Sequence, residues 1–148
     1  MSAPLEGIRV LDWTVYQQGP VSTVMLGDLG AEVIKIEERG AGDLSRQVSS
    51  WMGLPADLGE GRNFYFENNN YNKKGITLDL KNEGAREVLR RLVEHSDVFV
   101  LNIRQEVAQK LGVDYETLRG YNPQLIYAQA SGYGPEGEDT NRPTIDPM

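Results

Sequence analysis

The sequence predicts an α/β fold with a parallel sheet, because strand-like and helix-like segments alternate along the chain. The first unit shows the pattern most clearly. Val10 and Leu11 form a short β-prone run, Pro20 fits the first turn of a helix, and Gly30 is suited to end that helix. A second apolar run follows at residues 33–36. Because a short helical crossover joins the two runs, we expect parallel strands in a right-handed βαβ unit.

The later elements follow from the same patterns. In the first predicted helix, apolar residues repeat at helical spacing: Val21, Met25, Leu26 and Leu29. Residues 38–72 are expected to form a long connection. Beyond it we expect strands at 75–80, 97–101 and 124–130. Between them we expect a helix capped by Asn82, a short helix at 106–111 and a helix capped by Asp114. In the last of these helices, Tyr115 and Leu118 are expected to face inward.

Composition narrows the possible functions. The chain has 148 residues, enough for one domain with a core, and its formal net charge of −7 without a basic block disfavours nucleic acid as a partner. It has no cysteine, which excludes disulfides, thiolate metal sites and a cysteine nucleophile, and which fits a cytoplasmic location. No apolar segment approaches the length of a membrane span. The single histidine, His95, fits a helix C-terminus better than a zinc site.

The predicted sheet has a binding edge, because ligands of parallel α/β sheets lie beyond the carboxyl ends of the strands. This places residues 14–19 and 37–43 at that edge. No G-x-G-x-x-G follows the first strand, so ordinary NAD binding is disfavoured. Four cations are candidates to bind a phosphorylated ligand, although each also fits a solvated surface position: Lys81, Arg104, Lys110 and Arg142.

For other polar residues, a structural role explains the sequence pattern as well as a role in binding or catalysis. Asp12, Asp43 and Asp146 are candidate carboxylates, but Asp12 lies near a strand end, where an aspartate usually caps a turn. On its pattern alone, the segment 72–75 is a charged turn before a strand. Asn102 follows a strand and fits a helix cap.

Several ordered sequence blocks resemble the class III coenzyme A transferases, a family that includes formyl-CoA and carnitine CoA transferases and the α-methylacyl-CoA racemases. The blocks cover nearly the whole chain. They include Pro4-Leu5-Glu6-Gly7-Ile8-Arg9-Val10-Leu11-Asp12, Leu29-Gly30-Ala31-Glu32-Val33-Ile34-Lys35-Ile36-Glu37, Asn72-Lys73-Lys74-Gly75-Ile76-Thr77-Leu78-Asp79-Leu80-Lys81 and Ser131-Gly132-Tyr133-Gly134. Such blocks in one order are far more specific than any single motif.

The resemblance implies a Rossmann-like, CoA-binding N-terminal domain over residues 1–148, incomplete because full-length members are about twice this size or more. It also implies interlocked homodimers, an acyl-CoA and a carboxylic acid as substrates, and no metal. The positions that match family contacts to coenzyme A are Gln17, Gln18, Leu78, Asp79, Leu80, Lys81, Asn102, Ile103, Arg104, Lys110 and Arg142.

The chemistry implied by the resemblance is transfer of coenzyme A between carboxylic acids through an aspartyl acyl-enzyme intermediate. The nucleophilic aspartate is expected beyond Met148, so no residue here is predicted to be catalytic, and the chain alone is expected to be inactive. Asp146 matches an acidic position before that nucleophile. Ile145 stands where racemases carry a histidine, which disfavours racemase activity. A non-catalytic CoA-binding or partner subunit and an acyl-CoA racemase stay open as alternatives, and the sequence does not specify the acyl donor and acceptor.

Overall fold

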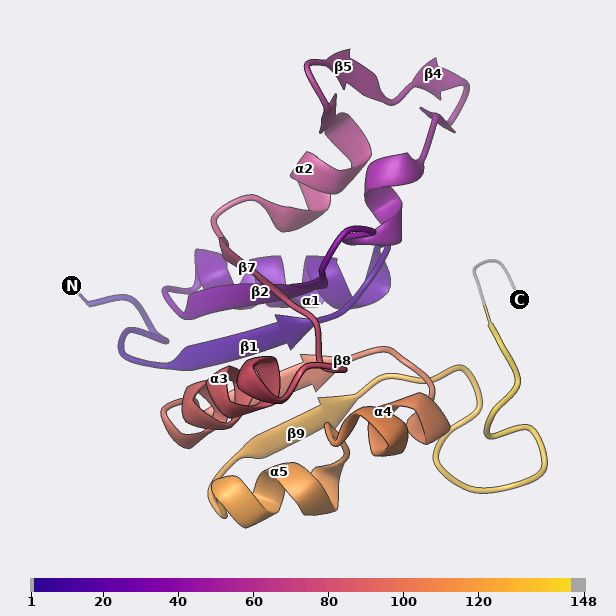
Figure 1. The fold of residues 1–148 in the computed structure, drawn as a ribbon. Coiled ribbons are helices and arrows are strands. Elements are labelled where there is room, and N and C mark those ends of the chain that lie inside the picture. Colours follow the sequence, from indigo (N-terminus) through magenta and orange to yellow (C-terminus); the bar gives the residue numbers. More distant parts are fainter. Residues whose placement is uncertain (1, 145–148) are drawn as a thin grey trace.

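The computed structural model describes residues 2–144 and contains a five-stranded parallel sheet in the order β7-β2-β1-β8-β9 (Figure 1). Its strands are β1 (Arg9–Trp13), β2 (Glu32–Glu38), β7 (Lys74–Leu78), β8 (Val98–Leu101) and β9 (Ile126–Gln129). The helices are α1 (Gln18–Asp28), α2 (Phe64–Asn70), α3 (Glu83–Glu94), α4 (Gln105–Leu111) and α5 (Tyr115–Tyr121). The first strand lies in the middle of the sheet and later strands are added on both sides of it, which is the strand order of a Rossmann fold. The predicted fold class is therefore confirmed.

The first βαβ unit matches the prediction from the sequence. β1 pairs in parallel with β2, and Asp12 lies opposite Lys35 in the register. Pro20 lies in the first turn of α1, where its missing N–H removes no helical hydrogen bond. Gly30 has a φ of +102° and follows the helix end. The chain therefore turns sharply between α1 and β2, as the sequence indicated.

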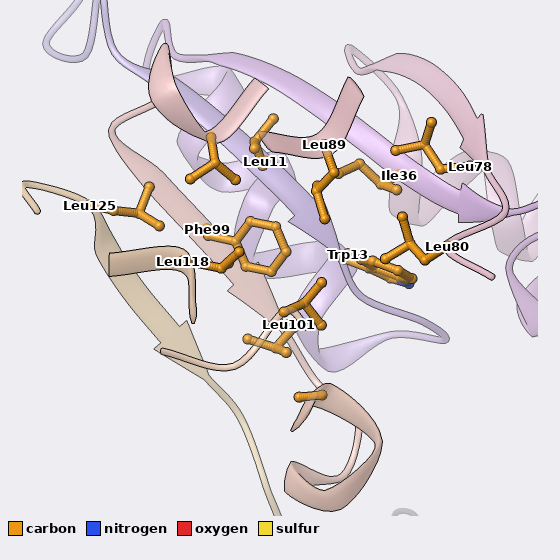
Figure 2. Packing of buried hydrophobic residues seen from close by; sticks show 13 residues of the cluster. Leu11, Trp13, Ile36, Leu78, Leu80, Leu89, Phe99, Leu101, Leu118 and Leu125 are labelled. Carbon is orange, nitrogen blue, oxygen red and sulfur yellow. The ribbon is translucent and has the colours of Figure 1, made fainter. Parts of the chain in front are cut away.

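The two faces of the sheet carry different cores. On one face, Leu11 and Trp13 of β1 pack in the larger cluster, with buried side chains from α3, α4 and α5 (Figure 2). On the other face, Val10 and Val33 pack in a smaller cluster that Leu26 of α1 joins. This alternation follows from the two-residue period of a strand. Helices therefore cover both faces, which leaves the strand ends as the natural place for a ligand.

The buried face of α1 differs from the apolar stripe in the sequence. Met25 is 60% exposed, and the residues that α1 buries are Gly19, Pro20, Thr23, Val24 and Gly27. The reason is close approach: a Cβ added at Gly19 would lie 2.4 Å from the Thr14 Cβ. Small residues let the helix lie directly on the sheet, and this contact overrides the apolar spacing.

The connection between β2 and β7 contains structure that the sequence did not reveal. A 3-10 turn, η1 (Leu44–Gln47), leads into two small hairpins formed by β3 (Ser50–Trp51), β4 (Leu54–Pro55), β5 (Asp57–Gly59) and β6 (Arg62–Asn63). Residues 49–63, here called the projecting segment, extend away from the sheet (Figure 1). The chain returns through α2, which begins because the Asn63 side chain accepts hydrogen bonds from the backbone of Tyr65 and Phe66.

Most predicted helix ends are confirmed. Asn82 caps α3 and Asp114 caps α5 through their side chains, and His95 follows the last turn of α3. The prediction that Tyr115 faces inward is wrong, because its side chain is 45% exposed beside Arg119. Leu118 is fully buried, as predicted.

Candidate functional site

A cavity of about 390 Å³ opens at the carboxyl edge of the sheet. It lies beyond the ends of β1, β2 and β7 and is bordered by α4. Its lining consists of Trp13, Thr14, Val15, Ile36, Glu37, Glu38, Gly42, Asp43, Leu44, Leu78, Asp79, Leu80, Lys81, Ile103, Val107 and Leu111. This is the edge where the strand pattern places a ligand.

Five of the predicted binding residues line this cavity: Leu78, Asp79, Leu80, Lys81 and Ile103. The leucines are 6% and 3% exposed and belong to the main core, so they form a fixed apolar wall. Within the described residues, the Lys81 ammonium makes no hydrogen bond or ion pair. An apolar wall beside an available cation suits a ligand with a flat apolar group and an anionic group.

The loop after β1 is held by side chains from other elements. The Lys35 ammonium donates to the Thr14 carbonyl at 2.5 Å. The Asn102 side chain accepts from the Val15 N–H and donates to the Val15 carbonyl, both at 2.9 Å. These contacts join β1 to β2 on one side and to β8 on the other. The loop is therefore built into the body rather than lying free at the surface.

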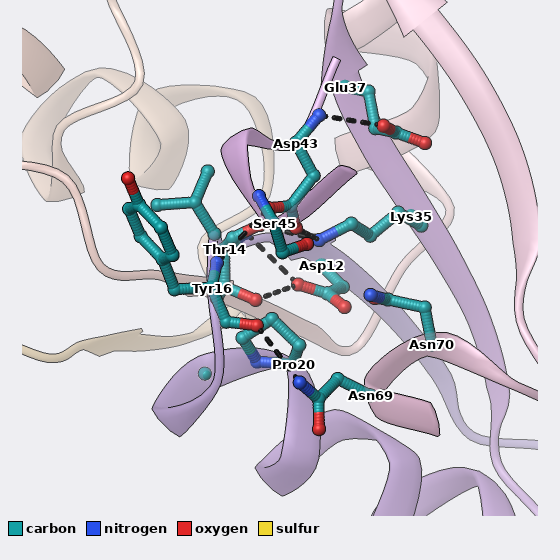
Figure 3. A network of polar contacts seen from close by, with 12 residues as sticks. Asp12, Thr14, Tyr16, Pro20, Lys35, Glu37, Asp43, Ser45, Asn69 and Asn70 are labelled. Carbon is teal, nitrogen blue, oxygen red and sulfur yellow. Dashed lines mark hydrogen bonds and ion pairs between the residues drawn. The ribbon is translucent and has the colours of Figure 1, made fainter. Parts of the chain in front are cut away.

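Tyr16 is the strained residue of this loop. Its φ of +65° is uncommon for a residue with a Cβ. Its N–H donates to Asp43 at 3.1 Å and its carbonyl accepts from Asn69 at 3.4 Å (Figure 3). Because both backbone groups are bound, the turn is stabilised in this conformation. It leads directly into α1, so the position of Gln17 and Gln18 depends on these contacts.

Asp12 is buried and bound on all sides. It accepts hydrogen bonds from the Thr14 backbone at 3.0 Å and from the Thr23 hydroxyl at 2.7 Å. The Lys73 ammonium lies 2.8 Å from its carboxylate and also donates to the Asn70 side chain at 2.8 Å. Asp12 does cap a turn, as predicted. The segment 72–75 was predicted to be a charged turn before a strand; within it the Lys73 side chain is buried, at 2% exposed, and paired with Asp12.

A second buried ion pair joins Lys35 to Asp43 at 2.7 Å. Burial raises the pKa of the Asp43 carboxyl, but Lys35 and two backbone N–H donors outweigh it and hold that pKa below its ordinary value. Nearby, Arg46 binds Glu37 through two hydrogen bonds of 2.8 Å and lowers the Glu37 pKa. Asp43 and Glu37 are therefore ionised and paired at neutral pH, which suits a structural role.

Comparison with known proteins decides the family. Residues 5–148 match CoA-transferase family III. The chain belongs to this family. The formyl-CoA:oxalate CoA-transferase of Bradyrhizobium sp. is 40% identical over 135 residues, which are 91% of this chain and 30% of that protein. The probable fatty acyl-CoA transferase Rv3272 of Mycobacterium tuberculosis is 42% identical over 143 residues, 97% of this chain and 35% of that protein.

Solved structures of relatives share the fold. A crystal structure of Rv3272 from Mycobacterium tuberculosis in an orthorhombic form matches with a TM-score of 0.86 at 42% identity, over 98% of this chain and 39% of that one. A CAIB/BAIF family protein of Brucella suis matches with a TM-score of 0.85 at 37% identity, over 96% of this chain and 37% of that one. The chain therefore spans about a third of the length of the class III relatives that it matches.

The other predicted binding residues of this class III chain lie outside the cavity lining. Asn102 is adjacent to Ile103, but its side chain is occupied by Val15. Arg104 precedes α4, is half exposed and lies 3.5 Å from Glu106. Lys110 is exposed in the last turn of α4, next to Leu111 of the lining.

Three further predicted residues are also absent from the cavity lining. Gln17 and Gln18 are exposed at the start of α1, and Gln17 accepts a hydrogen bond from the Tyr65 hydroxyl at 3.2 Å. Arg142 lies 3.6 Å from Asp139. Ile145 and Asp146, on which the comparison with racemases depends, lie outside the described residues.

Lys35 and Lys73 are buried residues that the sequence patterns did not indicate. A lysine within the apolar run 33–36 was the available signal, because a charge in a buried strand needs a partner. For Lys73 no local signal exists, since Asp12 is 61 residues away.

Two further findings concern metals and membranes. Among residues 2–144, no group of three or more His, Cys, Asp or Glu side chains is arranged to hold a metal ion. No helix in this part of the chain is long and apolar enough to cross a membrane.

Proposed function

We propose that this chain supplies the CoA-binding part of a CoA-transferase that moves coenzyme A between carboxylic acids through an aspartyl acyl-enzyme intermediate. The observation that carries the proposal is the cavity at the carboxyl edge, with apolar walls and the available ammonium of Lys81. Coenzyme A has a flat adenine and several phosphates, which match these two features. Membership of family III supplies the reaction class.

In this proposal the nucleotide end of coenzyme A lies in the cavity. Leu78, Leu80 and Ile103 contact the adenine, Asp79 shapes the turn at the rim, and Lys81 binds a phosphate. Three exposed cations outside the cavity lining are proposed to bind the remaining phosphates: Arg104, Lys110 and Arg142. Gln17, Gln18 and Asn102 contribute at the loop after β1, Asn102 by holding that loop in place.

The covalent chemistry is proposed to lie in the rest of the protein. In the implied reaction an aspartate carboxylate attacks the acyl carbon of the thioester, and the CoA thiolate leaves. We place that aspartate beyond Met148, so we expect this chain by itself to show no turnover. We also propose that the complete enzyme is an interlocked homodimer. A purified sample of the 148-residue chain that transfers coenzyme A between small acids would show that the nucleophile is misplaced.

Calorimetric titration tests the binding proposal. We expect the chain to bind coenzyme A and not NAD, because no dinucleotide fingerprint follows β1. Lys81→Ala should weaken binding of coenzyme A by about 1–3 kcal/mol, and Arg104→Ala or Lys110→Ala should weaken it within the same range, with less effect at high salt. Lys74→Ala is the matched control, because Lys74 begins β7 at the opposite edge of the sheet. Binding of NAD but not coenzyme A would contradict the proposal.

A further inference from the structure

Asp43 binds three separate parts of the chain through its two carboxylate oxygens. Its Oδ1 accepts hydrogen bonds from the N–H groups of Tyr16 at 3.1 Å and Ser45 at 2.9 Å (Figure 3). Its Oδ2 accepts from the Lys35 ammonium at 2.7 Å. The Asp43 side chain is inaccessible to solvent, yet the residue borders the cavity. Asp43 therefore joins the loop after β1 to β2 and η1 beside the candidate site.

The part of the loop that Asp43 holds is in an unfavourable conformation. Tyr16 has a φ of +65°, which only a few per cent of residues with a Cβ adopt, whereas glycine adopts positive φ about as readily as negative φ. Asp43 binds the Tyr16 N–H and Asn69 binds the Tyr16 carbonyl. Backbone strain of this kind persists only where surrounding contacts enforce it, and it is concentrated at functional sites.

The strained turn lies between the wall of the cavity and α1. Thr14 and Val15, the two residues before Tyr16, both line the cavity. On the other side of the turn, a Cβ added at Gly19 of α1 would lie 2.4 Å from the Thr14 Cβ, so the helix and the wall are already in close contact. If Tyr16 relaxed to a negative φ, the chain between them would change direction and the wall would move.

We propose that Asp43 is a positioning residue for coenzyme A, which holds Tyr16 in its strained conformation and thereby fixes the cavity wall. The proposal rests on the proposed function, in which coenzyme A is the ligand. Asp43 acts through the turn, because its carboxylate oxygens are occupied by groups of the chain itself. Without this hold, a residue with a Cβ would adopt the binding-competent turn a few per cent of the time and glycine about half of the time, and the apparent Kd rises as that fraction falls.

Calorimetric titration of the 148-residue chain with coenzyme A tests the proposal in the variant Asp43→Asn. An amide has one acceptor oxygen, so it cannot accept from the Tyr16 N–H on one side and from Lys35 on the other, as the carboxylate does. Tyr16→Gly and Tyr16→Ala are compared, because they differ only in the Cβ that causes the strain. In Asp43→Asn we expect Tyr16→Gly to bind coenzyme A about fivefold to tenfold more tightly than Tyr16→Ala. With Asp43 intact, the two should agree within about twofold, because the turn is held.

Met52 provides the matched control. Its φ is +51°, it lies in the projecting segment, and it is not among the residues that line the cavity. With Asp43 intact, glycine should give a higher Tm than alanine at both Tyr16 and Met52, because only glycine relieves the strain. In Asp43→Asn, however, Met52→Gly and Met52→Ala should bind coenzyme A equally.

The outcomes separate this inference from the proposed function. Equal Kd values for Tyr16→Gly and Tyr16→Ala in Asp43→Asn, or a Tm of Tyr16→Gly no higher than that of Tyr16→Ala, would overturn the inference and leave CoA binding standing. Failure of coenzyme A to bind the folded parent chain would overturn both. Circular dichroism checks folding. If Asp43→Asn does not fold, the same two Tyr16 variants are titrated with Lys35→Met and Asp43→Ala combined, which leaves no unpaired charge, and the same comparison decides.

Discussion

Asp12 and Lys35 lie opposite each other on neighbouring strands, yet each pairs with a residue from elsewhere in the chain. Asp12 binds Lys73, which precedes β7, and Lys35 binds Asp43, in the loop after β2. All four side chains are nearly inaccessible to solvent. Buried pairs add little net stability, because desolvation offsets their attraction, but removing one partner leaves an unpaired charge. Their main effect here is to fix how the loops meet the sheet.

Loss of one of these partners should be costly. We expect Lys73→Met to lower the free energy of unfolding by about 3–5 kcal/mol, because the Asp12 carboxylate stays buried without its cation. Urea denaturation measures the change. The matched control is Lys74→Met: the neighbouring side chain is 72% exposed, so its loss should leave stability close to that of the parent. Equal effects at the two positions would contradict the burial of Lys73.

The paired carboxylates of Glu37 and Asp43 also predict that the stability of the fold decreases at acidic pH. The pKa values of Glu37 and Asp43 lie below their ordinary values of 4.5 and 3.8. The unfolded chain therefore takes up protons first as the pH falls, so the stabilisation is complete above these ordinary values and is lost below them. We expect the Tm to be nearly constant from about pH 7 to pH 5 and to drop below about pH 4. Asp43→Asn should show a shallower decline, and a Tm that does not change down to pH 3 would contradict this account.

At the scale of elements, local patterns predicted the parallel sheet well. Pro20, Gly30, Asn82 and Asp114 mark helix ends through backbone chemistry that acts over a few residues. The family resemblance matched Leu78 to Lys81 to positions that contact coenzyme A, and all four residues line the cavity.

Elements that depend on distant contacts could not be predicted. α2 has three asparagines among its seven residues, which are weak helix formers, and tertiary contacts such as the buried Tyr65 support it. The ion pair of Lys73 could not be predicted for the same reason, because its partner Asp12 is distant in the sequence. The cations Arg104, Lys110 and Arg142 were predicted from their charge and from the family resemblance, and none of them is among the residues that line the cavity.

The contact between α1 and the loop after β1 gives a prediction about this helix. Gly19→Ala should destabilise the fold by about 1–3 kcal/mol, because the new Cβ would lie 2.4 Å from the Thr14 Cβ, where neither segment can move freely. Gly120→Ala is the control: this glycine is exposed in α5 and has open space around it, so alanine should be neutral or slightly stabilising. Thermal unfolding distinguishes the two, and a stable Gly19→Ala would contradict the close packing.

At the scale of the whole molecule, the chain exposes apolar surface unevenly. The projecting segment exposes Met52 (87%) and Leu54 (65%), and Trp51 and Leu58 of the same segment are exposed too. Leu118 and Leu125 are buried and add nothing to such a patch, whereas Ile126 is exposed on β9. Contiguous apolar surface promotes association.

We therefore expect the 148-residue chain to self-associate as its concentration rises. Replacing Met52 and Leu54 together with serine should reduce this association without lowering the Tm, because both side chains are largely exposed. Light scattering coupled to size exclusion measures the mass. A wild-type chain that stays monomeric at all concentrations would contradict the prediction.

The central claim is that coenzyme A binds at the carboxyl edge of the sheet. A crystal structure of this chain with coenzyme A tests it most directly. We predict the adenine against Leu78, Leu80 and Ile103 and a phosphate within hydrogen-bond distance of the Lys81 ammonium. Coenzyme A bound elsewhere on the chain, with this cavity free of the ligand, would contradict the account.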